Sequence, residues 1–125
     1  MIHLDTSFLI LALARGSRED RRLRAWLRAG ERLGISAIGW AEFLCGPAGS
    51  AALELAGRIV GEPAAFTAAD AVLAARLFDD TGRRRGSLAD CMIAATAIQV
   101  EASLATANPR DFARFAGPGL ALADE

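Results

Sequence analysis

Apolar residues gather in short runs that alternate along the chain with longer helical stretches. Positions 2–5, 33–36 and 103–106 each hold a short apolar run next to turn residues or a helix start, and we expect strands there. A final short strand is expected at 120–123, and a short extended piece at 64–66. Short apolar strands of this kind are typical of a parallel sheet that is covered on both faces.

Helical periodicity, N-capping residues and glycine or proline breakers fill the intervals between these strands. Thr67 and Asp70 have the spacing of a capping box, and Ser17 precedes two acidic residues as a helix cap would. Strands that alternate with helices indicate an α/β fold with helices on both faces of the sheet. The expected helices cover positions 6–14, 18–28, 37–45, 50–60, 67–80, 86–97 and 109–115.

The helix predicted at 86–97 is apolar on all sides, and such helices are usually buried inside a domain. Asp90 is nevertheless in its first turn, and it is the only charged residue between Arg85 and Glu101. A carboxylate that is removed from water needs compensation. Because Ser87 and Asp90 also have capping-box spacing, Asp90 either completes the helix start or faces a cleft that holds cations.

Other isolated acidic residues lie at the ends of predicted elements. Asp5 ends the first strand, where it either caps the next helix or serves a site at the carboxyl edge of the sheet. Glu42 is the only charged residue in 33–53, so it is either functional or at a solvent-exposed helix end. Asn108 and Asp111 follow the third strand and also fit an ordinary helix start.

Composition narrows the chemistry that these residues can perform. The chain has 125 residues, 53% apolar and 23% charged, with a net charge of −1, which indicates a folded domain rather than a broadly basic nucleic-acid binder. His3 is the only histidine, so a histidine zinc site and a Ser-His-Asp triad are both poorly supplied. Carboxylates without histidine or paired cysteine suit Mg²⁺ or Mn²⁺. Such an ion can activate water against a phosphodiester.

Four segments of the chain, in order, resemble the PIN-domain ribonucleases of the VapC-like toxin kind, which belong to prokaryotic toxin–antitoxin pairs. Ala107 departs from the family pattern, in which a basic residue is common at this position. The resemblance covers nearly the whole chain and is carried by these segments: Ile2 to Ser7 with its Asp-Thr, Trp40-Ala-Glu42-Phe-Leu-x-Gly46, Gly86-x-Leu88-x-Asp90 with the Ile-Ala-Ala-x-Ala helix, and Leu104-Ala-Thr106-x-Asn108-x-x-Asp111-Phe112.

The resemblance implies a three-layer α/β/α sandwich with a central, mainly parallel sheet, in one PIN-like domain over residues 1–125. It implies a Mg²⁺- or Mn²⁺-dependent endoribonuclease that acts on RNA as a toxin, forms a homodimer and binds a VapB-like antitoxin. The catalytic residues that it implies are Asp5, Glu42, Asp90, Asn108 and Asp111. The implied metal ligands are Asp5, Glu42, Asp90 and Asp111. Nearby hydroxyl groups would orient water or carboxylates, namely Thr6, Ser7 and Thr106.

Several interpretations stay open at this stage. The basic loop of Arg83, Arg84 and Arg85 either binds RNA or is a solvated loop. The apolar stripe of one helix is either a partner surface or core, and it comprises Leu23, Trp26 and Leu27. The alternatives to a toxin are a PIN-like nuclease with a housekeeping role in RNA processing and a catalytically weakened module that binds RNA or protein.

The two cysteines and the hydropathy pattern bear on where the protein is found. Cys45 and Cys91 lie in apolar helical stretches with no metal-binding spacing, so we expect buried free thiols in a reducing cytoplasm. The longest uncharged run is too short to span a membrane. The sequence therefore favours a soluble cytoplasmic protein.

Overall fold

Three short buried strands lie at the centre of the molecule. The computed structural model describes residues 1–124, and in that part of the chain the strands are β1 (Ile2–Leu4), β2 (Leu33–Gly34) and β3 (Ser103–Ala105). They form one sheet in the order β2-β1-β3, and both pairings are parallel. The parallel sheet that the apolar runs predict is therefore confirmed.

Helices take up most of the remaining chain, at the positions that the sequence predicts. Several end one to three residues inside the predicted limits, because a helix boundary depends on the local cap. Asp5, Ser17, Ser36 and Thr67 each accept a hydrogen bond from the first turn of the helix that follows. The helices are α1 (Thr6–Ala12), α2 (Arg18–Arg28), α3 (Ala37–Leu44), α4 (Ser50–Val60), α5 (Ala68–Asp80), α6 (Leu88–Gln99) and α7 (Pro109–Ala113).

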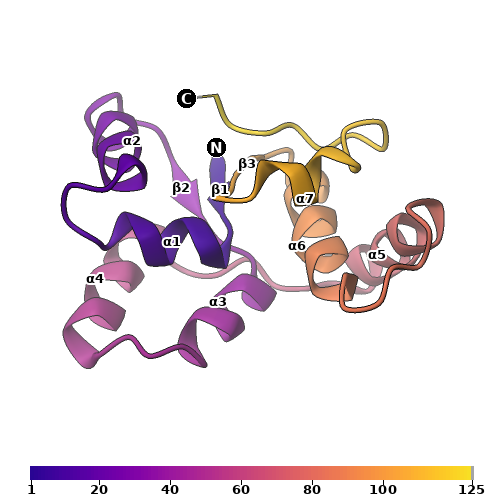
Figure 1. The fold of residues 1–125 in the computed structure, drawn as a ribbon, viewed down its shortest axis with the longest axis horizontal. Coiled ribbons are helices and arrows are strands. Elements are labelled where there is room, and N and C mark those ends of the chain that lie inside the picture. The colour runs from indigo at the N-terminus through magenta and orange to yellow at the C-terminus, as the bar shows by residue number, and fades with distance from the viewer. Residues whose placement is uncertain (125) are drawn as a thin grey trace.

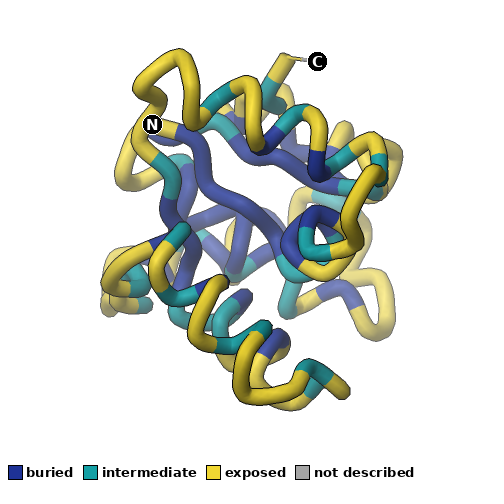
Figure 2. The backbone as a smooth tube through the Cα atoms, turned by 90° about the vertical axis from the view of Figure 1, so that its left-hand side faces the viewer, coloured by how far each residue is buried: buried dark blue, intermediate teal, exposed yellow. Residues whose placement is uncertain are grey.

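The helices are divided between the two faces of the sheet (Figure 1). Ile2 and Leu4 of β1 belong to a buried cluster with residues of α1, α2 and α4. Leu104 of β3 belongs to a second cluster with residues of α5, α6 and α7. Figure 2 shows the buried chain in the interior, with exposed segments around it. The chain has the three-layer α/β/α arrangement that the sequence predicts.

The last predicted strand is the main error of the sequence prediction. Instead of a strand at 120–123, the chain makes an isolated parallel bridge between Leu104 and Leu122. Two backbone hydrogen bonds hold it, Leu104 N to Ala121 O and Ala123 N to Leu104 O, both at 2.8 Å. The strand predicted at 33–36 similarly stops at Gly34.

Beyond β2 the backbone pairs with a different partner. Ser36 forms an isolated parallel bridge with Ala64, the first residue of the extended piece predicted at 64–66. The Ser36 hydroxyl also caps α3 by accepting a hydrogen bond from Gly39 N. The chain therefore leaves the sheet at this residue because it has to start a helix.

One cysteine departs from the expected burial, and the only histidine is buried with a nitrogen atom that is unpaired within residues 1–124. Cys91 is a buried free thiol as predicted, but Cys45 is exposed, because it lies just past the end of α3. His3 is buried, yet its Nδ1 atom has no hydrogen-bond partner among the described residues, and burial lowers its pKa. Within residues 1–124, no helix is long and apolar enough to cross a membrane.

The capping box at the start of α5 is confirmed and has a further partner. Asp70 N donates to the Thr67 hydroxyl, and Thr67 N donates to the Asp70 carboxylate. The Thr96 hydroxyl of α6 also lies 3.2 Å from the Asp70 Oδ2 atom, and both side chains are buried. This carboxylate therefore joins the start of α5 to the middle of α6.

Substitution of Asp70 by alanine should lower the free energy of unfolding by ~1–2 kcal/mol, because a cap and a buried hydrogen bond are lost together. Urea denaturation followed by circular dichroism measures this change. Asp79→Ala is the matched control on the same helix, since Asp79 pairs only at the surface with Arg83. Equal losses in both variants would contradict the prediction.

Candidate active site

A cavity of about 290 Å³ opens where β1 and β3 end. Every acidic residue that the sequence offers as a candidate for the site contributes to its wall, although these residues come from four separate segments of the chain. The cavity is lined by Asp5, Thr6, Ser7, Ile10, Glu42, Asp90, Ile93, Asn108, Asp111 and Phe112. The structure thus brings the predicted catalytic residues together.

Asp5 is the buried member of this group, with only 4% of its surface exposed. Its Oδ1 atom accepts hydrogen bonds from Phe8 N and from the Ser7 hydroxyl, both at 2.8 Å. Its Oδ2 atom accepts one from the Thr106 hydroxyl at 2.5 Å. Asp5 is therefore the N-cap of α1 and also faces the cavity, so the two alternatives left by the sequence are compatible.

Opposing effects act on the pKa of Asp5. Burial raises the pKa above its usual value, and the negative charge of Glu42 adds to this rise. The hydrogen bonds from Thr106, Phe8 and Ser7 work in the opposite direction, because they stabilise the ionised form. Burial has the largest effect, so the pKa of Asp5 stays raised.

Glu42 reaches the cavity from the exposed side of α3. The Thr6 hydroxyl lies 2.8 Å from the Glu42 Oε1 atom and 3.1 Å from the carbonyl oxygen of Gly39. Thr6 thereby connects the first turn of α1 to α3. This contact directs Glu42 toward the end of β1, where Asp5 lies.

Asp90 does not have the capping role that its spacing with Ser87 suggests. Ser87 makes no side-chain cap hydrogen bond to α6, and its hydroxyl instead donates to the carbonyl oxygen of Arg84. The Ser87 backbone has φ −95° and ψ −1°, outside the extended region that a serine cap usually adopts. The capping-box interpretation of Ser87 and Asp90 is therefore wrong.

The Asp90 carboxylate is left half-buried beside the other acids, with 35% of its side chain exposed. Burial raises its pKa above the usual value, and the charges of Asp111, Glu42 and Asp5 raise it further. The guanidinium of Arg114, 3.8 Å away, is the opposing influence. The cavity therefore concentrates negative charge.

Asn108 and Asp111 complete the wall from the start of α7, and both are exposed. Pro109 occupies the first turn of this helix as predicted, but the Asn108 side chain makes no cap hydrogen bond. Asn108 N instead donates to the Thr106 hydroxyl at 3.0 Å. Ala107 N similarly donates to the Ser7 hydroxyl at 3.2 Å. The Thr106 hydroxyl, which is predicted to lie near the carboxylates, thus joins this loop to Asp5.

The donor set fits a hard divalent cation, because four carboxylates face one cavity and no histidine or cysteine lines it. Within residues 1–124, no three metal-ligating side chains already surround a common point. Glu42 and Asp111 are exposed, so each can change rotamer and approach Asp5 and Asp90. The ligand assignment from the sequence remains a prediction.

The basic loop at 83–85 lies between α5 and α6 and does not line this cavity. Arg83 turns back to α5, where it pairs with Asp79 and lies over the ring of Phe78. Arg84 and Arg85 are exposed. A contact of this loop with RNA therefore stays a prediction.

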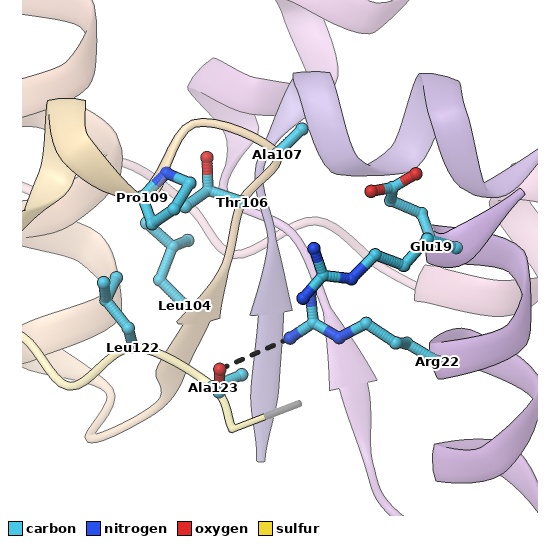
Figure 3. A pocket seen from close by; sticks show the side chains of 9 residues that line it. Glu19, Arg22, Leu104, Thr106, Ala107, Pro109, Leu122 and Ala123 are labelled. Carbon is cyan, nitrogen blue, oxygen red and sulfur yellow. Dashed lines mark hydrogen bonds between the residues drawn. The ribbon is translucent and has the colours of Figure 1, made fainter.

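A second cavity of about 150 Å³ lies beside the loop that carries Thr106 and Ala107 (Figure 3). Arg22 of α2 enters it and donates to the carbonyl oxygen of Ala123 at 3.3 Å. The Arg22 guanidinium also lies over the rings of Phe8 and Trp26. Arg22 therefore holds the end of the chain against α2.

Arg114 is the residue beside the acidic cavity that sequence reasoning missed. The only local signal is its position within Phe-Ala-Arg-Phe, 112–115, where a charged side chain interrupts an apolar segment. That pattern could equally mark a surface residue. Its proximity to Asp90 depends on how α7 packs against α6.

Comparisons with known proteins agree with this geometry. The family model described as PIN domain matches residues 2–118. None of the curated proteins compared with the chain matches it. Among solved structures, a chain of VapBC2 from Rickettsia felis bound to a promoter DNA fragment superimposes with a TM-score of 0.79 at 24% identity, covering 100% of this chain and 99% of that one.

Two further structures are slightly more similar in sequence. A chain of VapBC-1 from nontypeable Haemophilus influenzae is 25% identical with a TM-score of 0.71, covering 99% of this chain and 98% of its own. A chain of DNA-bound VapBC from Salmonella typhimurium is 26% identical with a TM-score of 0.71, covering 98% of this chain and 96% of its own.

Replacing Thr106 by valine should raise the pKa of Asp5 further, because Oδ2 loses its donor. A carboxyl whose pKa is higher in the folded than in the unfolded protein favours folding when protonated. Stability therefore falls as pH rises from about 3.8, the ordinary Asp value, through the raised pKa.

Thr106→Val should extend this fall to higher pH and reduce stability near pH 7 by ~1–3 kcal/mol. Thermal unfolding in EDTA across a pH series measures both effects. Thr106→Ser, which keeps the hydroxyl group, should retain the wild-type pH profile. A serine variant that behaves like the valine variant would refute the proposed role of the hydroxyl group.

Proposed function

This chain belongs to the PIN-domain family, and we propose that it is the nuclease toxin of a toxin–antitoxin pair, cleaving RNA with a bound divalent cation. The observation that carries the proposal is the convergence of Asp5, Glu42, Asp90 and Asp111 on one cavity. PIN domains are nucleases, and the matched VapBC structures are toxin–antitoxin complexes. A homodimer is also part of this proposal, by analogy with the family.

The carboxylates would hold Mg²⁺ or Mn²⁺, and the bound ion would supply activation of water and stabilisation of the leaving oxygen of a phosphodiester. Asp5 is the fixed ligand, because three donors hold its two oxygens. Glu42 is directed toward it by Thr6. Asn108 and Asp111 are exposed at the rim and would contact the RNA or complete the metal shell.

Asp5→Asn and Asp90→Asn should each reduce RNA cleavage by at least 100-fold while the protein remains folded. The amide has nearly the same shape as the carboxylate but does not supply its charge to the cation. Cleavage of a labelled single-stranded RNA with Mg²⁺ or Mn²⁺ measures the rate, and circular dichroism checks folding.

Asp79→Asn is the matched control, because Asp79 is exposed on α5 and does not line the cavity. Undiminished metal-dependent cleavage by both site variants would exclude the assignment. Expression in cells adds a test of toxicity: the wild type should arrest growth and Asp90→Asn should not. Cleavage without growth arrest would favour a housekeeping nuclease instead.

For the antitoxin we propose an apolar groove of about 370 Å³ between α1, α2 and α4. The predicted partner stripe contributes only in part: Leu23 and Leu27 line the groove, whereas Trp26 stacks on Phe8 and packs against the core. Leu27 and Leu55 are 48% and 50% exposed on either side of the groove. Such a groove suits the apolar face of a helix.

Leu27→Asp and Leu55→Asp should weaken antitoxin binding by roughly 10- to 100-fold, since each buries a charge in an apolar interface. RNA cleavage by the free protein should be unchanged. Isothermal titration with a candidate antitoxin from the same genome measures the affinity. Val72→Asp is the control, because Val72 is 62% exposed on α5, away from the groove. Wild-type affinity in both groove variants would place the antitoxin elsewhere.

A further inference from the structure

Arg114 is the residue that the proposed reaction does not yet use. It follows α7 as its C-cap, and only 16% of its side chain is exposed. Its Nε and Nη2 atoms are buried and make no hydrogen bond to the described residues. A largely buried guanidinium with two unpaired nitrogen atoms is unfavourable unless a negative charge compensates it. Groups close to Arg114 must therefore compensate its positive charge.

Three groups lie close to this guanidinium, namely the Phe115 ring, the Asp90 carboxylate and the Cys91 thiol. The ring of Phe115 lies below it, with 4.6 Å between the Cζ atom and the ring centroid. The Asp90 Oδ2 atom lies 3.8 Å from Nη2, too far for a hydrogen bond but close enough for strong electrostatic attraction. Since the pair is partly shielded from water, the attraction is greater than that of a surface ion pair.

The cavity in front of Arg114 holds an unbalanced charge. Asp5, Glu42, Asp90 and Asp111 all line it, and within residues 1–124 its wall contains no Arg and no His. Like charges gathered in one place repel one another and oppose folding. Arg114 does not line the cavity. Among these four acids it forms an ion pair with Asp90.

We propose that Arg114 is a built-in counter-ion of this acidic cluster, a positioning residue that holds the Asp90 carboxylate and offsets part of the charge that attracts a divalent cation. The inference rests on the proposed function only in taking the cavity as a cation site. It has two measurable consequences, one in the metal-free protein and one in metal affinity.

The first test is a double-mutant cycle in EDTA with wild type, Arg114→Met, Asp90→Asn and the double variant. The contribution of Arg114 to the unfolding equilibrium constant should be roughly tenfold larger when Asp90 is charged than when it is Asn. Urea denaturation measures each constant. A packing role for Arg114 alone would give the same effect in both backgrounds, and that result would overturn the proposal.

The second test is Mn²⁺ binding, followed by isothermal titration. Arg114→Met should bind Mn²⁺ about three- to tenfold more tightly than wild type, because a positive charge near the cation is lost. Arg114→Lys should retain wild-type affinity. Arg110→Met removes the same charge from an exposed position on α7 and should change the affinity less than twofold.

Unchanged or weaker Mn²⁺ binding by folded Arg114→Met would overturn the proposal, since damage to the site alone weakens binding. Should this variant fail to fold, Arg114→Gln replaces it in both tests. Wild type that neither binds Mn²⁺ nor cleaves RNA would refute the proposed function. The cycle in EDTA would still decide whether Arg114 balances the charge of Asp90.

Discussion

The buried carboxylate of Asp5 is the group on which the arrangement of the site depends. It directly follows β1, caps α1 and accepts a hydrogen bond from Thr106 just beyond β3. A carboxylate with 4% exposure is unfavourable unless hydrogen bonds compensate it, and here three donors do so. Removing any of these segments would leave a buried acceptor unsatisfied, so the fold and the site constrain each other.

Hydroxyl groups extend this constraint from Asp5 to the rest of the cavity. Thr6 directs Glu42, Ser7 accepts from Ala107 N, and Thr106 accepts from Asn108 N. A hydroxyl group can donate and accept at once, which lets one side chain join a carboxylate to a neighbouring backbone. The loop before α7 is thereby fixed in position relative to β1, although few of its residues are buried.

The acidic cavity is a place where function opposes stability. Burial and neighbouring charges both raise the pKa of Asp90, and Arg114 is the opposing charge. The apolar helix α6 behind Asp90 limits how far the backbone can move to relieve this repulsion, because half of its residues are buried. The free energy of unfolding therefore depends on which cations lie close to these carboxylates.

Local signals in the sequence determined the helices, most of their caps and the identity of the candidate acids. Caps, periodicity and breakers act over a few residues, so these features can be predicted without a fold. The strand at 120–123, the Ser87 cap and the burial of Cys45 were wrong, because pairing and burial depend on distant segments. Only the tertiary structure decided that Thr6 meets Glu42 and that Arg114 meets Asp90. Both contacts join residues far apart in the chain, and the packing of one helix against another brings them together.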